Sequence, residues 1–382
     1  MKDTAYYSAA SCDLAAFKAL TSRQLAPADA PRAAAIEKNV PLYDVATLTL
    51  DDPAERTALM AEWAAVLRDH SGVLVLRRAV PDHAALDAAS AAYEAIIADE
   101  KSASGAKADH FAAAGANDRI WNSLQKLCLR DPQAFAASFA SPAIDAVAEA
   151  WLGPGYQMTA QVNLVRPGGK AQTAHRDFHL GFQTGEEAAR FPAHVHQLSP
   201  FLTLQGAVAH CDMPLESGPT KLLPFSQLYG PGYMAYREPE FAAHFEEAFI
   251  QLPLQKGDAL FFSPALFHGA GDNVSADIQR MANLLQVSSP MGRAMESLDR
   301  LAMSLALYPA LQTLSLPPLA EAAAIAACAE GYSFPTNLDT DPPAGGLAPE
   351  TQAALMRRAR AEGWSATAFA EAAKAQHARR QP

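Results

Sequence analysis

The sequence predicts a mainly β fold with flanking helices, built on a double-stranded β-helix (a jelly-roll, cupin-like core) with helical additions at its N-terminal and C-terminal ends. Residues 153–290 contain short β-like runs separated by glycine and proline turns, which is typical of an antiparallel jelly roll. On either side the spacing of apolar residues becomes helical. We therefore expect an N-terminal extension over 1–50, a jelly-roll domain with its own N-terminal helices over 51–290, and a helical C-terminal extension over 291–382 that packs on the same domain.

The segment before the β-rich region predicts a helix, a strand and a second helix. Leu59, Trp63 and Leu67 recur with helical spacing in DDPAERTALMAEWAAVLRDH, which starts with an Asp-Pro capping signal. SGVLVLRRAV follows as a buried strand. PDHAALDAASAAYEAIIADE then predicts another helix, with proline at its start.

Turn residues divide the β-rich region into strands and also mark the ends of the later helices. YQMTAQVNLV ends at RPGG, and KGD separates LPLQ from ALFF. After residue 290 the chain returns to alanine-rich helix, interrupted by the loop SFPTNLDTDPPAGG. APETQAALMRRARAEG predicts a helix with Pro349 near its start and Gly363 at its end, and the charged, alanine-rich C-terminus predicts a solvated or frayed helix.

Composition limits the class of protein. The chain has 382 residues, half of them apolar, and its formal charge of -11 argues against broad nucleic-acid binding, which needs a basic face. The four cysteines form no CxxC pair, so we expect reduced, structural thiols. The N-terminal segment lacks the apolar core of a signal peptide, and no run of about eighteen uncharged apolar residues occurs. We therefore expect a cytoplasmic protein without membrane or nucleic-acid partners.

The stretch TAHRDFHLGFQ predicts a metal site. Its residues His175, Asp177 and His179 occupy alternate positions, so their side chains would point the same way in a strand. Downstream, His268 follows a predicted strand and Arg280 lies on the next one. Two histidines and one carboxylate on one face of an iron ion leave three positions open, as in non-haem Fe(II) oxygenases. Two of these positions suit a bidentate 2-oxoacid and the third admits O2, while an arginine fork suits the far carboxylate of 2-oxoglutarate.

At these residues the sequence resembles the phytanoyl-CoA dioxygenase family of Fe(II)/2-oxoglutarate-dependent oxygenases, over roughly residues 67–286. The resemblance includes GVLVLRRAVPDHAAL, the HxD pair, HCDMPLESGPTKLLPFSQ and HGAGDNVSADIQR. It implies that His175, Asp177 and His268 bind Fe(II) and form the catalytic centre. It also implies that Arg280 holds the cosubstrate 2-oxoglutarate.

Two positions depart from the family pattern. The family often has serine two residues after the distal histidine, where it helps the arginine bind the carboxylate, but this chain has Ala270. A second partner for the carboxylate must therefore come from elsewhere. The PGSH-like segment reads PFSQ and lacks its histidine.

Three further residues are candidates for the same pocket. If His179 were a third ligand, the metal donors on this one strand would span about 13 Å, which is too far for one metal ion. We therefore expect His179 to face the substrate or to support the metal ligands, with a plain barrel-lining role as the alternative. Asn163 belongs to a polar strand face that could bind the 2-oxoacid end of the cosubstrate, the alternative being a solvated outer face. Asn122, beside Trp121, could cap the substrate pocket, unless this segment only anchors a helix.

Other polar residues are expected to be structural. For His194 and His196 we favour an ordinary strand with partly exposed histidines over a zinc site, because no third donor lies nearby. His210 is expected to pack in the core. Asp212 and Glu216 are expected to order a loop.

The resulting prediction is a dioxygenase that hydroxylates an unactivated C–H bond of a small molecule and releases succinate and CO2. Asp177 fills the position that related halogenases leave for chloride, which favours hydroxylation; desaturation and ring formation stay open. The alternatives are a cupin-like metal protein with a non-redox or ligand-binding role and a non-catalytic scaffold. A free small molecule is favoured over a CoA ester, because the scattered cations Lys170, Arg176, Lys221 and Arg237 form no phosphate site. The C-terminal helices either form a homodimer or cover the pocket.

Overall fold

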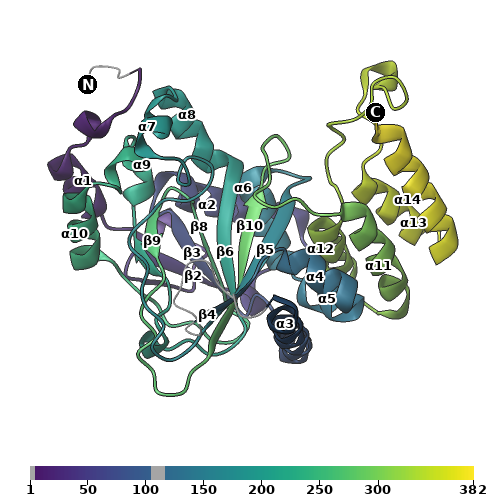
Figure 1. Cartoon of the computed structure of the whole chain (residues 1–382), viewed down its shortest axis with the longest axis horizontal. Coiled ribbons are helices and arrows are strands. Elements are labelled where there is room, and N and C mark those ends of the chain that lie inside the picture. Colours follow the sequence, from purple (N-terminus) through teal and green to yellow (C-terminus); the bar gives the residue numbers. More distant parts are fainter. Residues whose placement is uncertain (1–4, 105–116) are drawn as a thin grey trace.

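A computed structural model describes residues 5–104 and 117–382 of the chain. Its main feature is an eight-stranded mixed sheet in which every neighbouring pair is antiparallel except β2–β3 (Figure 1). In spatial order the strands are β1 (Ala35–Glu37), β2 (Val40–Asp44), β3 (Val73–Arg77), β8 (Ala259–Phe262), β6 (Thr203–Ala209), β10 (Arg280–Ser288), β5 (Gln157–Val165) and β4 (Asn117–Ile120).

A smaller sheet completes the jelly roll. Strands β7 (Lys221–Leu223) and β9 (Phe267–Gly269) pair antiparallel, and single bridges extend them on both sides: His175 pairs with His268, and Leu222 with Ile250. An apolar core that includes side chains from both sheets joins them. The predicted jelly-roll core is thus present.

The two faces of the main sheet have different neighbours because strand side chains alternate in direction. Met281, Leu285 and Val287 of β10 belong to the large core that the sheet shares with the helices. Ala282 and Leu284 of the same strand belong to the core toward the smaller sheet. The outer face is covered by α2 (Pro53–Asp69), α3 (His83–Ser104), α4 (Ser123–Arg130), α5 (Pro132–Ser138) and α6 (Pro142–Leu152).

The helix, strand and helix predicted before the β-rich region are confirmed as α2, β3 and α3. Asp52 starts α2, because its carboxylate accepts hydrogen bonds from the backbone N–H groups of Ala54 and Glu55, and Pro53 occupies the first turn. Trp63 and Leu67 are fully buried on the face that packs against the sheet.

Four helices follow the barrel: α11 (Arg300–Thr313), α12 (Pro318–Cys328), α13 (Gln352–Ala361) and α14 (Ala366–Arg380). Gly363 ends the α13 turn with a positive φ of 68°, as predicted. The C-terminal segment is not a frayed helix: Phe369 and Ala373 of α14 are buried in the same core as the sheet. The proposed domain boundaries stay a prediction.

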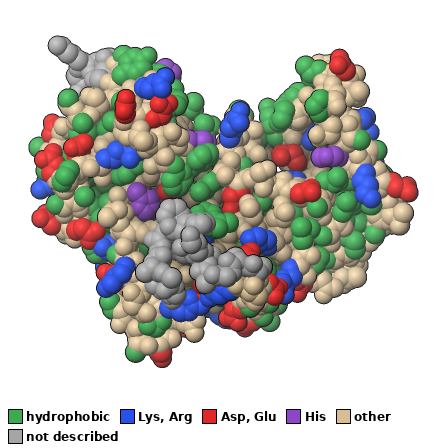
Figure 2. Space-filling model, in the orientation of Figure 1, with side chains coloured by type: hydrophobic (Ala, Val, Ile, Leu, Met, Phe, Trp, Pro, Cys, Tyr) green, Lys and Arg blue, Asp and Glu red, His purple; other side chains and the backbone are tan. Residues whose placement is uncertain are grey.

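Shorter helices lie on the opposite side of the barrel (Figure 1). They are α1 (Leu14–Thr21), α7 (Gly185–Ala189), α8 (Ala193–Leu198), α9 (Gly232–Ala235) and α10 (Pro239–Ala248). A notch separates the α7–α8 region from the C-terminal helices in the space-filling view (Figure 2).

The prediction of a mainly β protein is wrong in its proportions, because more of the described residues lie in helices than in strands. The stretch FPAHVHQLSP is also not a strand: His194 and His196 lie on α8, and His196 is buried with its Nε2 2.9 Å from the Ala188 carbonyl oxygen. Within the described ranges, no helix is both long and apolar enough to cross a membrane.

The N-cap of α2 provides a stability test. Asp52→Ala removes the acceptor for two backbone N–H groups and should lower the free energy of unfolding by about 1 kcal/mol. Asp51→Ala is the matched control, since Asp51 is exposed and precedes the cap. Urea unfolding followed by circular dichroism measures both; equal midpoints for the two variants would contradict the capping role.

Candidate metal centre

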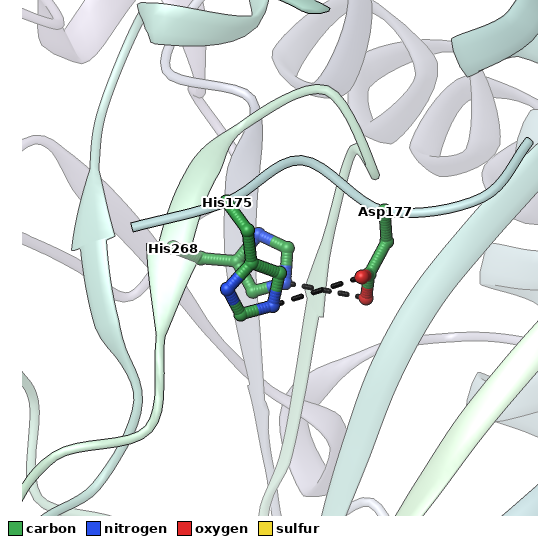
Figure 3. Close-up of side chains that lie close together, drawn as sticks. All are labelled: His175, Asp177 and His268. Carbon is green, nitrogen blue, oxygen red and sulfur yellow. Dashed lines mark ion pairs between the residues drawn. The ribbon is translucent and has the colours of Figure 1, made fainter. Parts of the chain in front are cut away.

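Three side chains converge between the two sheets (Figure 3). One potential ligand atom each from His175, Asp177 and His268 lies within 4.8 Å of the others. His175 Nε2 is 3.6 Å from one carboxylate oxygen of Asp177, and His268 Nε2 is 3.4 Å from the other. Ligand atoms about 2.1 Å from one ion lie roughly 3 Å apart at adjacent positions, so this cluster is close to the size that a single metal ion requires.

Backbone pairing aligns the two histidines. The His175 N–H donates to the His268 carbonyl oxygen at 3.0 Å, and the His268 N–H donates back at 3.2 Å. Each imidazole is oriented in the same way: Nδ1 of His175 lies 2.9 Å from the Thr173 carbonyl oxygen, and Nδ1 of His268 lies 2.8 Å from that of Leu266. A proton on each Nδ1 leaves both Nε2 atoms free to bind metal.

The stretch TAHRDFHLGFQ is not a continuous strand, contrary to the expectation. His175 forms a bridge with His268, and the chain then turns, so that Asp177 is fixed by donation of its N–H to the Pro264 carbonyl oxygen. The side chains of His175, Asp177 and His179 therefore do not all point to the same face, as they would in a strand. His179 is not part of the three-residue cluster.

Asp177 is held as a carboxylate. Burial opposes its ionisation, but the adjacent His268 and His175 and a hydrogen bond donated by Gln205 Nε2 outweigh burial and hold the pKa of the carboxyl below its usual range. The pKa of His175 is lowered by burial and by the neighbouring His268. A carboxylate beside a neutral imidazole is the protonation state that metal binding needs.

Arg280, at the start of β10, is a buried cation. Its side chain is 6% exposed, and burial lowers its pKa to about 10. Nη1 donates to the Ser217 carbonyl oxygen at 3.1 Å, and no carboxylate pairs with it in the part of the chain that the structure describes. A buried guanidinium without a carboxylate partner is stabilised by an anionic ligand.

Asn163 lies on the same side of the sheet as Arg280. In the register of β5 with β10, Asn163 faces Ala282, two residues along the strand from Arg280. Its amide oxygen is buried and lacks a hydrogen-bond partner among the described residues. The strand face that carries Asn163 is thus an inner face, and Asn163 is available for a ligand there.

Asn122 has a local role in the fold. It adopts a left-handed conformation with φ of 53° immediately before α4, which asparagine tolerates better than most residues. Its backbone N–H donates to Glu296 at 2.7 Å. A contact between Asn122 and substrate stays a prediction, as does one for His179.

Two expected structural residues behave as predicted. His210 is buried, its Nδ1 lies 2.9 Å from the Ser90 hydroxyl, and burial lowers its pKa to about 4. Asp212 accepts a hydrogen bond from the Lys256 backbone at 2.9 Å, which ties two loops together.

Two further polar residues near the centre were missed from the sequence. Gln205 contacts Asp177, and Arg119 donates to Gln161 on the adjacent strand at 3.1 Å while lowering the pKa of His175 through its charge. A glutamine inside the apolar run LTLQGAVA was a detectable signal, since a polar residue in a buried strand needs a partner. The sequence around Arg119 gives no sign that this residue lies near the metal centre, because its neighbours there come from other strands.

The fold and the ligand set define the class: two histidines and a carboxylate in a jelly roll are the arrangement of non-haem iron oxygenases. The family comparison is more specific. Residues 69–282, more than half of the chain, match the family described as phytanoyl-CoA dioxygenase (PhyH). The chain therefore belongs to the phytanoyl-CoA dioxygenase family, whose oxygenase-type chemistry uses iron and 2-oxoglutarate.

Solved structures with a similar chain trace include two enzymes of nogalamycin biosynthesis. The non-haem α-ketoglutarate-dependent epimerase SnoN is 19% identical, with 63% of this chain and 84% of that chain covered and a TM-score of 0.40. The non-haem α-ketoglutarate-dependent carbocyclase SnoK is 18% identical, with 67% and 90% covered and a TM-score of 0.44. SnoN has also been solved with Fe3+, α-ketoglutarate and nogalamycin RO. No curated protein matches the chain significantly.

Iron content separates the ligands from their neighbour. His268→Ala should lose most of the iron that the wild-type protein binds after anaerobic reconstitution, about one Fe(II) per chain, because two donors hold a labile metal poorly. His179→Ala should keep it. Metal analysis of the desalted proteins measures this, and iron loss in the His179 variant would overturn the assignment.

Proposed function

We propose that the protein is an Fe(II)/2-oxoglutarate-dependent dioxygenase that hydroxylates an unactivated C–H bond of a small molecule. The observation that carries this proposal is that two features occur together. One is the buried cluster of two histidines and one carboxylate. The other is Arg280, a buried cation that has no carboxylate partner in the described ranges. A metal site alone would suit many cupin-like proteins. A second site for a dicarboxylate favours the oxygenase.

The cofactors supply the oxidising chemistry: one O2 and one 2-oxoglutarate give succinate and CO2, and one oxygen atom enters the substrate C–H bond as a hydroxyl. The protein's own residues bind and orient the metal ion and the cosubstrate. His175, Asp177 and His268 would hold the iron on one side, leaving the opposite side for 2-oxoglutarate and O2. Arg280 would bind the far carboxylate, and the Asn163 side-chain NH2 group would donate toward the 2-oxoacid end.

Hydroxylation is favoured over halogenation because Asp177 supplies a carboxylate where a halide would need space. The same cofactors support desaturation and ring formation, which mass spectrometry of the product distinguishes by a gain of one oxygen or a loss of two hydrogens. A cupin-like protein with a non-redox or ligand-binding role is the alternative. It predicts no succinate from 2-oxoglutarate.

The distribution of cations supports a substrate other than a CoA ester. Arg176 is 2% exposed and donates to the carbonyl oxygens of Ser226 and Tyr229, and Lys221 pairs with Glu246. Two of the four cations considered for a CoA phosphate are thus engaged elsewhere.

The cosubstrate site can be tested by kinetics. Arg280→Ala should raise the KM for 2-oxoglutarate about 10- to 100-fold. This is the effect of losing about 1.5–3 kcal/mol from hydrogen bonds that involve a charged group. Arg280→Lys should restore part of the loss because it keeps the charge without the fork. Succinate formation at varied 2-oxoglutarate measures both variants, and iron content is the control for folding of the centre.

His175→Ala should abolish succinate formation, and a chelator should do the same to the wild-type protein until Fe(II) is returned. Zn(II) at the same concentration should not restore it, because zinc has no redox chemistry. An unchanged KM in Arg280→Ala would contradict the role of Arg280, and absence of succinate with every substrate tried would favour the cupin-like alternative.

A further inference from the structure

Two neighbouring glutamines beside the metal centre have side-chain amide oxygens without hydrogen-bond partners among the described residues. Gln205 on β6 and Gln286 on β10 are direct neighbours in the register, so their side chains point to the same inner face. They are 4% and 7% exposed. The Oε1 atoms of both are buried with no partner among the described residues. Gln205 Nε2 donates to Asp177, which places this glutamine pair next to the iron ligands.

More unsatisfied groups continue from this pair, away from Arg280. Thr203 and Ser288 are the next inward-facing partners on the same two strands, both fully buried, and their hydroxyl oxygens have no partner in the described ranges. The two ring nitrogens of His179 are also buried, with the Arg293 backbone as a nearby partner. His179 lies beside this end of the sheet, because its backbone N–H donates to the hydroxyl of Ser199, which precedes β6.

Such a cluster is unusual for a protein interior. Buried polar groups are nearly always hydrogen-bonded, because an unsatisfied one has lost its bonds to water without replacement. The four of these side chains that lie on β6 and β10 could have been apolar without harm to the sheet, as the alternate face of the same strands shows. Unsatisfied groups also occur elsewhere in the core, but their concentration at one end of the metal centre indicates a ligand that supplies the missing partners.

The chemistry of the groups indicates the class of ligand. Two amide oxygens accept hydrogen bonds only, whereas the two hydroxyls both donate and accept. None of the five side chains carries a fixed positive charge to balance a carboxylate or phosphate, the two amide oxygens cannot donate to such an anion, and an acyl chain would leave every group unsatisfied. A neutral compound with several hydroxyl groups satisfies all of them.

We propose that the substrate is a neutral, polyhydroxylated small molecule whose hydroxyl groups donate to Gln286 and Gln205. This inference rests on the proposed oxygenase function. Gln286 and Gln205 each offer an unpartnered Oε1, and the Nε2 of Gln205 is already bound to Asp177. The link from Gln205 to Asp177 places a bound hydroxyl, and the C–H bond next to it, beside the iron.

The test uses Gln286→Met, which keeps the length of the side chain and removes the amide. Gln133→Met is the matched control, on the exposed surface of α5. The visible charge-transfer absorption of the Fe(II)–2-oxoglutarate complex is recorded anaerobically while probes are added. The neutral probes are methyl β-D-glucopyranoside, myo-inositol and sorbitol, and the acyl probes are hexanoate and hexanoyl-CoA; succinate formation in air is measured with the same set.

We expect at least one neutral probe to shift the absorption and stimulate succinate formation. Gln286→Met should raise the concentration for a half-maximal response about 3- to 10-fold, the effect of one uncharged hydrogen bond, while leaving the absorption without probe unchanged. Gln133→Met should match the wild type.

The inference is overturned if the absorption forms but no neutral probe alters it, if only the acyl probes do, or if Gln286→Met responds like the wild type. Failure of the absorption to form in the wild-type protein has a different meaning. It removes the proposed function itself, and the substrate inference with it.

Discussion

The structure of the metal centre depends on the backbone pairing of His175 with His268. Two reciprocal hydrogen bonds join segments that are far apart in the sequence, and this bridge extends the smaller sheet. Because paired residues in adjacent strands lie side by side, the bridge fixes the two imidazoles next to each other, with ring centroids 4.4 Å apart. The turn after His175 then needs only to bring Asp177 to the same point.

Arg176 stabilises that turn from the side opposite the metal. Its buried guanidinium donates to the carbonyl oxygens of Ser226 and Tyr229 and lies over the rings of Tyr233 and Phe267, at 5.1 and 5.3 Å. The contact at α9 requires glycine, since a Cβ at Gly232 would come within 1.9 Å of the Arg176 guanidinium carbon. The HxD segment is therefore fixed by a side chain that packs against Ser226, Tyr229, Tyr233 and Phe267 and is not part of the three-residue cluster.

The C-terminal helices affect the site through one connection. Their apolar faces share a core with the outer face of the main sheet. The segment between β10 and α11, however, reaches the inner side: Met295 contacts Gln161, and Glu296 accepts a hydrogen bond from the Asn122 backbone. Burial raises the pKa of Glu296, as expected for a carboxyl enclosed between the barrel and α4. The extension thus supports the fold and also forms part of the wall near the polar inner face.

The sequence by itself determined the elements whose signals are local. Helical spacing and the cap at Asp52 placed α2, turn residues divided the strands, and the HxD pair with the downstream His268 and Arg280 indicated an iron site with a cosubstrate cation. Tertiary structure decided what depends on partners distant in the chain. Sheet register decides three features: that TAHRDFHLGFQ forms a turn, which face of β5 is inside, and which glutamine lies beside Asp177. Register is set by the packing of the two sheets rather than by any one segment.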